Sequence, residues 1–399
     1  MEIYEATEDC EINEQGDKYY KVDSRALLFD LIEDWNDGTI EVQDILLKRE
    51  YIDAKGEQIR LNYTEIMHKN DKPKATIAIL HGFGQNSDLF VELGIQFALN
   101  GYIVQAIDFR GYGWSGGRRV EHTLIEMQDD IVALLKESDP DIPLFLYSHS
   151  MGGLITFSFL MNNPDLNISG VISQAPVTAS PEFVKIDSFR LMLVKFLGQE
   201  IPELLLNARI NTSSVSKKAI VMKWMLSSRK VVPILGVRQA HIISYLMHHF
   251  FYNAKSFTHP VLIHLANDDK VVNNNATKKF FEKIGSEDKQ MFEYDGVYHE
   301  LQYEDCAKEM FRNNINWLNA RFKEGNTFKL GAIDFDKIKV ALLKKKAPFK
   351  QWKLLITSIV LAYYAIGYLL MISKIVNKDR HEMIAFWPCS LFKKFFGKK

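Results

Sequence analysis

The sequence is poor in cysteine. Its 399 residues include only three, Cys10, Cys306 and Cys389, and no two of them form a C-x-x-C pair. Such widely spaced cysteines argue against a disulfide framework and against a structural zinc site. We therefore expect a protein of a reducing compartment that holds no metal.

The beginning of the chain lacks the apolar stretch of a secretory signal. Seven of the first 17 residues are acidic, which is the opposite of a signal or an arginine-rich transit peptide. We expect no cleaved targeting segment here. We interpret residues 1–40 as an acidic leader that packs on the surface of the following domain.

A large net charge is also absent, because the formal charge at pH 7 is -1. The basic residues gather at one end, where residues 321–399 carry 17 lysines and arginines against five acids. Because this charge surrounds a long apolar segment, it favours contact with a membrane surface. We expect no nucleic-acid partner.

One uncharged run interrupts this basic end. Residues 354–373 contain no charged side chain and lie between Lys353 and Lys374. About 20 apolar residues match the ~30 Å hydrocarbon core of a bilayer. The end of the chain is thus predicted to comprise a basic juxtamembrane linker (326–353), a transmembrane helix (354–374) and a basic-aromatic tail (375–399).

The charges beside this helix do not set its orientation, because both flanks are similarly basic. The simplest expectation is a single-pass C-terminal anchor that inserts after synthesis and leaves the large domain in the cytosol. The endoplasmic reticulum and the mitochondrial membrane are not distinguished by the sequence.

The middle of the chain alternates between apolar runs and helical patterns. Strands are predicted at 75–80, 102–107, 144–147, 170–173 and 261–265, with helical segments between or after them. This alternation is typical of an α/β domain, with a mostly parallel sheet and helices on both faces. The predicted core has two parts, 41–180 and 258–325.

The alternation stops between residues 181 and 257. This block contains helical apolar clusters and no clear strand. We interpret it as a helical insertion, and we expect it to form a lid whose apolar underside admits an acyl chain.

A candidate nucleophile follows the strand at 144–147. The next residues read Ser148-His149-Ser150-Met151-Gly152-Gly153 and lead into a helical pattern. A serine on such a strand-to-helix turn projects its hydroxyl from the backbone, close to the next amide. Ser148 stands where the usual pattern has glycine.

A serine nucleophile needs a base and an acid that orients this base. His299 follows a predicted strand and is the candidate base, whereas His149 is expected to point away and to serve packing. Either Asp268 or Asp269, in the loop after 261–265, is the candidate acid. The spacing from these aspartates to His299 fits one helix and one strand.

The oxyanion formed during acyl transfer needs two backbone amides. The Met151 amide is one candidate, at the start of the helix after Ser150. The turn His81-Gly82-Phe83-Gly84, directly after the strand at 75–80, can direct the Phe83 amide to the same point.

These motifs, together with the Asp-Phe-Arg-Gly-Tyr-Gly-Trp-Ser-Gly-Gly run at 108–117, resemble the monoacylglycerol lipase and lysophospholipase branch of the serine α/β hydrolases. The resemblance covers about residues 45–322. It implies the α/β-hydrolase fold, hydrolysis of a carboxylic ester of a single-chain lipid without a cofactor, and Asp269 as the triad acid. Gln85 departs from the glutamate common in monoacylglycerol lipases, as Ser148 departs from the usual glycine.

The combined expectation is a membrane-anchored serine hydrolase that cleaves monoacylglycerol or lysophospholipid through an acyl-enzyme. Two alternatives stay open. One is a hydrolase-like accessory or scaffold subunit of a membrane complex, with weak or no activity. The other is an acyltransferase or thioesterase that uses the same triad. The expected partners are a lipid ester, the membrane and, for the first alternative, the other subunits.

Overall fold

The computed structural model describes most of the chain between Cys10 and Lys339. The described residues are 10–12, 18–21, 37–42, 44–54, 59–70, 72–117, 122–179, 188–201, 204–207, 214–228, 230–231, 234–321, 330–331 and 333–339. The predicted transmembrane helix at 354–374 and the tail at 375–399 lie outside them. Within the described part of the chain, no helix is both long and apolar enough to cross a membrane.

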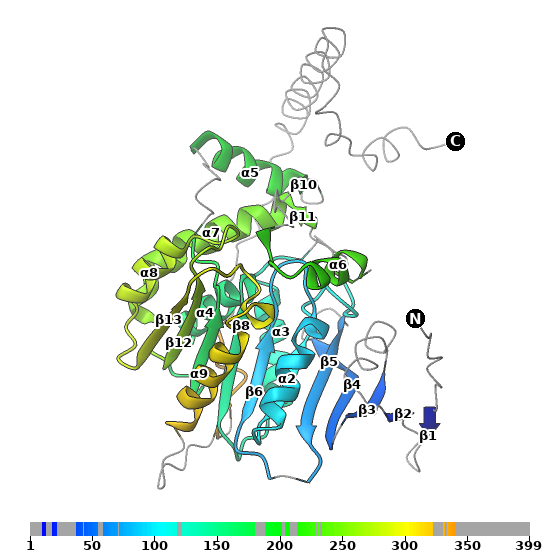
Figure 1. The fold of residues 1–399 in the computed structure, drawn as a ribbon. Helices are drawn as coiled ribbons and strands as arrows, with labels where there is room; N and C mark the ends of the chain where they lie inside the picture. The colour runs from blue at the N-terminus through cyan, green and yellow to red at the C-terminus, as the bar shows by residue number, and fades with distance from the viewer. Residues whose placement is uncertain are drawn as a thin grey trace, which may run out of the picture.

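An 11-stranded sheet forms the centre of the molecule (Figure 1). Its order is β1-β2-β3-β4-β5-β7-β6-β8-β9-β12-β13. The strands from β7 to β13 pair in parallel, and β3, β4, β5 and β7 pair with one another in antiparallel fashion. The strands are β1 (Cys10–Ile12), β2 (Lys18–Lys21), β3 (Gly38–Val42), β4 (Ile45–Ala54), β5 (Ile59–His68), β6 (Thr76–Leu80), β7 (Ile103–Ile107), β8 (Leu144–His149), β9 (Gly170–Gln174), β12 (Val261–Ala266) and β13 (Lys289–Tyr294).

The central strands are buried on both faces. In β6, Ala78 and Leu80 belong to one apolar cluster and Ile77 and Ile79 to another, because successive side chains of a strand point to opposite faces. Helices α3, α4, α7 (Val237–Asn253) and α8 contribute to the first cluster, and α2, α6 (Ala219–Ser227) and α9 to the second. The core helices are α2 (Val91–Ala98), α3 (Met127–Lys136), α4 (Met151–Asn162), α8 (Asn274–Lys283) and α9 (Ala307–Asn319).

The expected leader at 1–40 contains sheet residues. Strands β1 and β2 and the start of β3 lie in it and extend the sheet beyond β4. The sequence predicts no strand in this leader, whereas these described residues form the strands at one edge of the sheet. Strands of three to five residues are too short to show a recognisable alternation of apolar and polar residues. In addition, β2 and β3 pair in parallel, so no tight turn in the sequence marks their pairing.

The inserted block lies over the carboxyl ends of the parallel strands (Figure 1). It contains α5 (Ser188–Glu200), α6 (Ala219–Ser227) and α7 (Val237–Asn253), as well as a two-stranded sheet of β10 (Leu205–Asn207) and β11 (Ile234–Gly236). The sequence predicts no strand here. Three-residue strands that pair across a long separation carry no alternating pattern, so the sequence could not indicate them.

The beginning of the predicted juxtamembrane linker contacts the core. The Leu330 amide donates to the Ile142 carbonyl, and the Lys339 amide donates to Asn163 Oδ1. The Asn167 side chain donates to the Leu330 carbonyl. These described residues therefore pack on the domain.

An aromatic cluster joins the inserted block to the core. Phe250 of α7 stacks on Phe280 of α8 with ring centroids 4.1 Å apart, and it meets Phe157 of α4 edge to face at 5.7 Å. All three rings are almost fully buried. The cluster holds α7 in place above α4 and α8.

We expect Phe250→Ala to lower the free energy of unfolding by about 3–5 kcal/mol, because it removes a buried ring and leaves a cavity. Tyr252→Ala is the matched control, since Tyr252 lies on the same helix and is 75% exposed. It should change stability by no more than about 0.5 kcal/mol. Urea unfolding checks both values, and equal losses would contradict the packing described.

Candidate active site

The turn between β8 and α4 holds Ser150 in a strained conformation. Its backbone has φ 52° and ψ -115°, which a residue other than glycine rarely adopts. Such strain costs on the order of 1–3 kcal/mol and persists only where the surroundings enforce it. Here the Ser150 amide donates to the Gln174 carbonyl, and the Val177 amide donates to the Ser150 carbonyl, each at 3.0 Å.

Close packing on both sides explains the small residues of this turn. A Cβ at Gly152 would overlap the Leu80 carbonyl oxygen at the end of β6. Ser148, the departure from the usual glycine, fits because its buried hydroxyl donates to Ser173 Oγ at 2.9 Å on the neighbouring strand β9. The sharp turn at Ser150 thus forms with serine at position 148.

The loops after β12 and β13 bring Asp269 and His299 together. His299 Nδ1 donates to Asp269 Oδ2 at 2.7 Å, and both side chains are almost fully buried. The other carboxylate oxygen of Asp269 accepts from the Val271 and Val272 amides at 2.6 and 3.1 Å. This loop holds the carboxylate in the position from which it binds His299.

The neighbouring Asp268 points elsewhere. Its side chain is 51% exposed and lies 3.6 Å from Lys217 Nζ. The structure therefore distinguishes the two aspartates that the spacing alone left open, because Asp269 alone of the pair contacts His299.

The environment of His299 favours its protonated form. Burial lowers the pKa of His299, but the charge and hydrogen bond of Asp269, helped by the charge of Glu300, outweigh burial and raise it. An imidazole so placed is stabilised once it has accepted a proton. Because Nδ1 is bound to Asp269, the nitrogen that can accept this proton is Nε2.

The turn that carries Ser150 and the loop that carries His299 lie side by side at the carboxyl ends of the parallel strands. The ring of His149, which directly precedes Ser150, lies 4.7 Å from the ring of His299 between centroids. The parallel strands β8, β12 and β13 all end here, and ligands of α/β sheets bind outside these carboxyl ends.

The predicted oxyanion turn lies against Ser150. A Cβ at Gly82 would stand 3.1 Å from Ser150 Cβ, so the turn passes directly beside Ser150. His81 stabilises the turn, since its Nδ1 lies 2.8 Å from the Gly82 carbonyl and its Nε2 accepts from the Phe109 amide at 2.9 Å. Gly84 ends the turn with φ 73°. The Phe83 amide belongs to this turn, and the Met151 amide begins α4.

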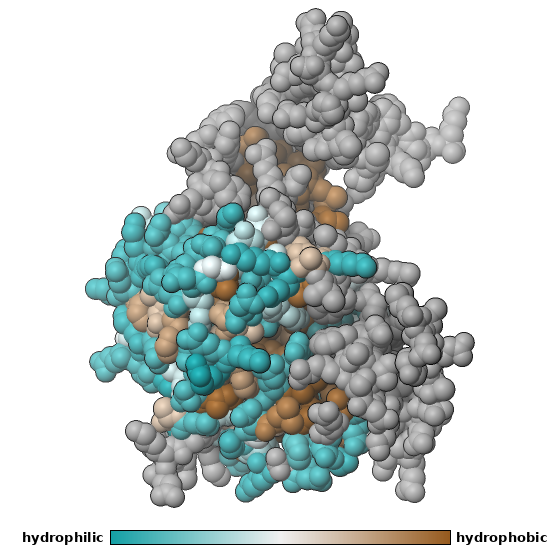
Figure 2. Space-filling view, in the orientation of Figure 1, coloured by the Kyte–Doolittle hydropathy of each residue, from teal (hydrophilic) through white to brown (hydrophobic). Residues whose placement is uncertain are grey.

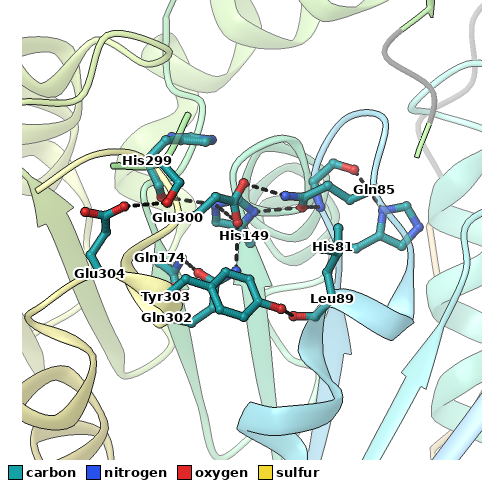
Figure 3. Close-up of polar contacts among 12 residues, drawn as sticks. His81, Gln85, Leu89, His149, Gln174, His299, Glu300, Gln302, Tyr303 and Glu304 are labelled. Atoms are coloured by element: carbon teal, nitrogen blue, oxygen red, sulfur yellow. Dashed lines mark hydrogen bonds and ion pairs between the residues drawn. The ribbon is translucent and has the colours of Figure 1, made fainter. Parts of the chain in front are cut away.

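A buried polar network adjoins these residues and was not predicted from the sequence (Figure 3). Gln85 Nε2 donates to Glu300 Oε1 at 2.6 Å, and Gln302 Nε2 donates to Glu300 Oε2 at 2.7 Å. His149 Nδ1 lies 2.9 Å from Gln85 Oε1. The expectation that His149 points away from the base is wrong, because its ring lies 4.7 Å from the ring of His299 between centroids.

Among the described residues, one group of possible metal ligands is found, and it consists of two histidines and the glutamate of this network. Ligand atoms of His149, His299 and Glu300 lie within 4.8 Å of one another. Both oxygens of Glu300 accept hydrogen bonds from amide side chains, and His299 is bound to Asp269. The group is thus organised by hydrogen bonds among protein side chains.

The inserted block is tied to the loop that carries His299. Glu304 accepts from Ser216 Oγ at 2.6 Å and from the Lys217 amide at 2.7 Å. The Glu300 amide donates to the Val215 carbonyl at 3.1 Å. Residues 214–217 therefore link the block above the sheet to the candidate base.

Comparison with known proteins agrees with this geometry. A family model described as "Serine aminopeptidase, S33" matches residues 71–305, more than half of the chain. The chain is 26% identical over 254 residues to an uncharacterized abhydrolase domain-containing protein of Dictyostelium discoideum, covering 63% of this chain and 27% of that protein. The chain thus spans about a quarter of the length of that relative.

Other relatives match over most of their length. The monoacylglycerol lipase of Mycolicibacterium smegmatis is 25% identical, with 65% of this chain and 93% of that protein covered. The crystal structure of Paleococcus ferrophilus monoacylglycerol lipase superimposes with a TM-score of 0.60 at 25% identity, covering 65% of this chain and 98% of that one. The sheet, the turn at Ser150 and these matches together show that the chain belongs to the serine aminopeptidase S33 family of the α/β hydrolases.

Proposed function

We propose that this protein is a membrane-anchored serine hydrolase that cleaves the carboxylic ester of a single-chain lipid, a monoacylglycerol or a lysophospholipid, through an acyl-enzyme. The observation that carries the proposal is the buried Asp269–His299 pair beside the strained Ser150 turn. The names of relatives support the substrate class, since they include monoacylglycerol lipases and a Bacillus subtilis protein named Phospholipase YtpA.

In the proposed reaction, Ser150 Oγ attacks the ester carbonyl carbon while His299 Nε2 takes the hydroxyl proton. The carbonyl π electrons move to oxygen, and the backbone amides of Phe83 and Met151 stabilise that oxyanion. Collapse of the intermediate breaks the bond to the alcohol, which leaves with the proton from His299. Water then repeats the sequence on the acyl-enzyme and releases the fatty acid.

Asp269 acts on the base in two ways. Its hydrogen bond to Nδ1 leaves Nε2 toward the nucleophile, and its charge stabilises the imidazolium that forms in each step. The two amides that bind its other oxygen prevent the carboxylate from turning. This arrangement supports proton transfer without reorganisation of the site.

An apolar surface of the inserted block supports a lipid substrate. Exposed Met192, Leu205 and Ile234 lie on α5, β10 and β11. In Figure 2, brown residues gather at this end of the molecule, whereas the surface near α8 is mainly teal. Such a patch on a lid offers an apolar path for an acyl chain.

The uncharged run at 354–373 supports membrane anchoring. A lipid ester partitions into the bilayer, so a tethered enzyme meets its substrate at high effective concentration. We propose a single C-terminal span with the hydrolase domain in the cytosol.

We expect a fluorophosphonate probe to label the wild-type protein and not Ser150→Ala, because the probe captures an activated serine. Wild-type protein should also release fatty acid from at least one of a panel of monoacylglycerols, lysophospholipids and acyl thioesters. With a lysophospholipid or an acyl thioester as donor, glycerol added as acceptor distinguishes hydrolysis from acyl transfer, since transfer yields a new ester. Absence of both labelling and turnover in detergent and in bilayers would instead favour an accessory subunit.

Asp269→Asn should lower kcat by about 10³–10⁴-fold, because an amide cannot hold the required histidine tautomer or stabilise its charge. Asp268→Asn is a matched control in the same loop and should leave kcat nearly unchanged. Steady-state kinetics on a soluble ester checks both variants. The assignment of the acid is contradicted if Asp268→Asn is the more damaging change.

We expect the full chain expressed in cells to stay in the membrane pellet after alkaline carbonate extraction. A chain that ends after residue 353 should move to the supernatant, because it lacks the apolar run. Equal recovery of both chains in the supernatant would contradict the anchor.

A further inference from the structure

Glu300 is a buried carboxylate that the proposed reaction does not use. It follows His299 directly, is 1% exposed, and its two oxygens accept from Gln85 and Gln302. A buried carboxylate is unfavourable unless it is hydrogen-bonded, so the partners of Glu300 indicate what holds it there.

Gln85 connects this carboxylate to the oxyanion turn. While its Nε2 donates to Glu300, its Oε1 accepts from the Gly82 amide at 2.8 Å and faces His149 Nδ1 at 2.9 Å. An ionised carboxylate only accepts hydrogen bonds, so it fixes which end of the amide faces the turn. Gly82 is the residue before Phe83, and it lies against Ser150.

We propose that Glu300 is a positioning residue, whose ionised carboxylate orients the Gln85 side chain and thereby holds the oxyanion turn beside Ser150. This inference deepens the proposed function and rests on it. Glu300 has a second effect on the site. Its negative charge beside His299 favours the imidazolium that forms when the base accepts the serine proton.

Protonation of Glu300 at Oε1 would reverse the orientation of Gln85. A protonated oxygen toward Gln85 becomes a donor facing the donor Nε2, and the amide must turn to accept from it. The turned amide then presents Nε2 to the Gly82 amide, and the hydrogen bond that holds the oxyanion turn is lost. Ionised Glu300, which cannot donate from either oxygen, is therefore the state that fixes this orientation of Gln85.

This ionisation falls near neutral pH. Burial is the largest influence and raises the pKa of Glu300 to about 7, although the charge of His299 and the hydrogen bonds from Gln302 and Gln85 lower it. The titratable groups that face or influence the carboxylate are His149, His299, Asp269, Tyr147 and Tyr303. Small changes of pH around neutrality thus alter the charge that orients Gln85.

The test measures kcat/KM against pH on a soluble ester, with the full chain in detergent micelles, for wild type, Glu300→Gln and the double variant Gln85→Glu/Glu300→Gln. We expect Glu300→Gln to lose about tenfold on the pH plateau, since displacement of the turn misplaces one oxyanion donor. The acidic limb of the kcat/KM profile of Glu300→Gln should shift to lower pH, because loss of the negative charge lowers the pKa of His299.

In the double variant, the hydrogen bond between residues 85 and 300 again joins a carboxylate and an amide, but the carboxylate is now on residue 85. It should recover most of the plateau rate. A merely structural role of Glu300 predicts neither the shifted limb nor this recovery. An unshifted limb, or a double variant no better than Glu300→Gln, overturns the inference.

Fluorophosphonate labelling separates this result from the proposed function. A wild-type protein that neither hydrolyses esters nor takes up the probe would overturn both proposals. A wild-type protein that does both, with a Glu300→Gln profile that superimposes on its own, would overturn the positioning role alone.

Discussion

The strained backbone at Ser150 is the constraint on which the site depends. A left-handed turn at a residue with a side chain is unfavourable by itself, so it must be enforced by its neighbours. The approach of α4 to the end of β6 at Gly152 and the hydrogen bonds to β9 and the following loop supply that enforcement. The packing of α4 against β6 and β9 thereby determines the position of the Ser150 hydroxyl.

Two buried carboxylates act around that hydroxyl in different ways. Asp269 is held by backbone amides and binds His299 directly, whereas Glu300 is held by two amide side chains and reaches the oxyanion turn through Gln85. In a buried site, each charge is effective because little water screens it. The ring of His299 and the turn at Gly82 thus have separate electrostatic supports.

The inserted block is coupled to this site at two places. Phe250 packs α7 onto α4 and α8, and Glu304 accepts hydrogen bonds from Ser216 and Lys217 close to His299. The first contact is apolar and gives stability, and the second is polar and sets position. Movement of the block over the strand ends would therefore displace the loop that carries His299.

The sequence by itself determined the α/β architecture, the Ser150 turn, the His299 loop and the Phe83 turn, because each is encoded by residues adjacent in the chain. Long apolar runs and small residues at close approaches are local signals. The tertiary structure alone decided that β1 and β2 join the sheet, that β10 pairs with β11, and that Asp269 contacts His299 while Asp268 faces solvent. It also decided that His149, Gln85 and Glu300 form one network. These outcomes depend on contacts between segments far apart in the chain, and no local pattern of residues specifies which side chains such contacts bring together.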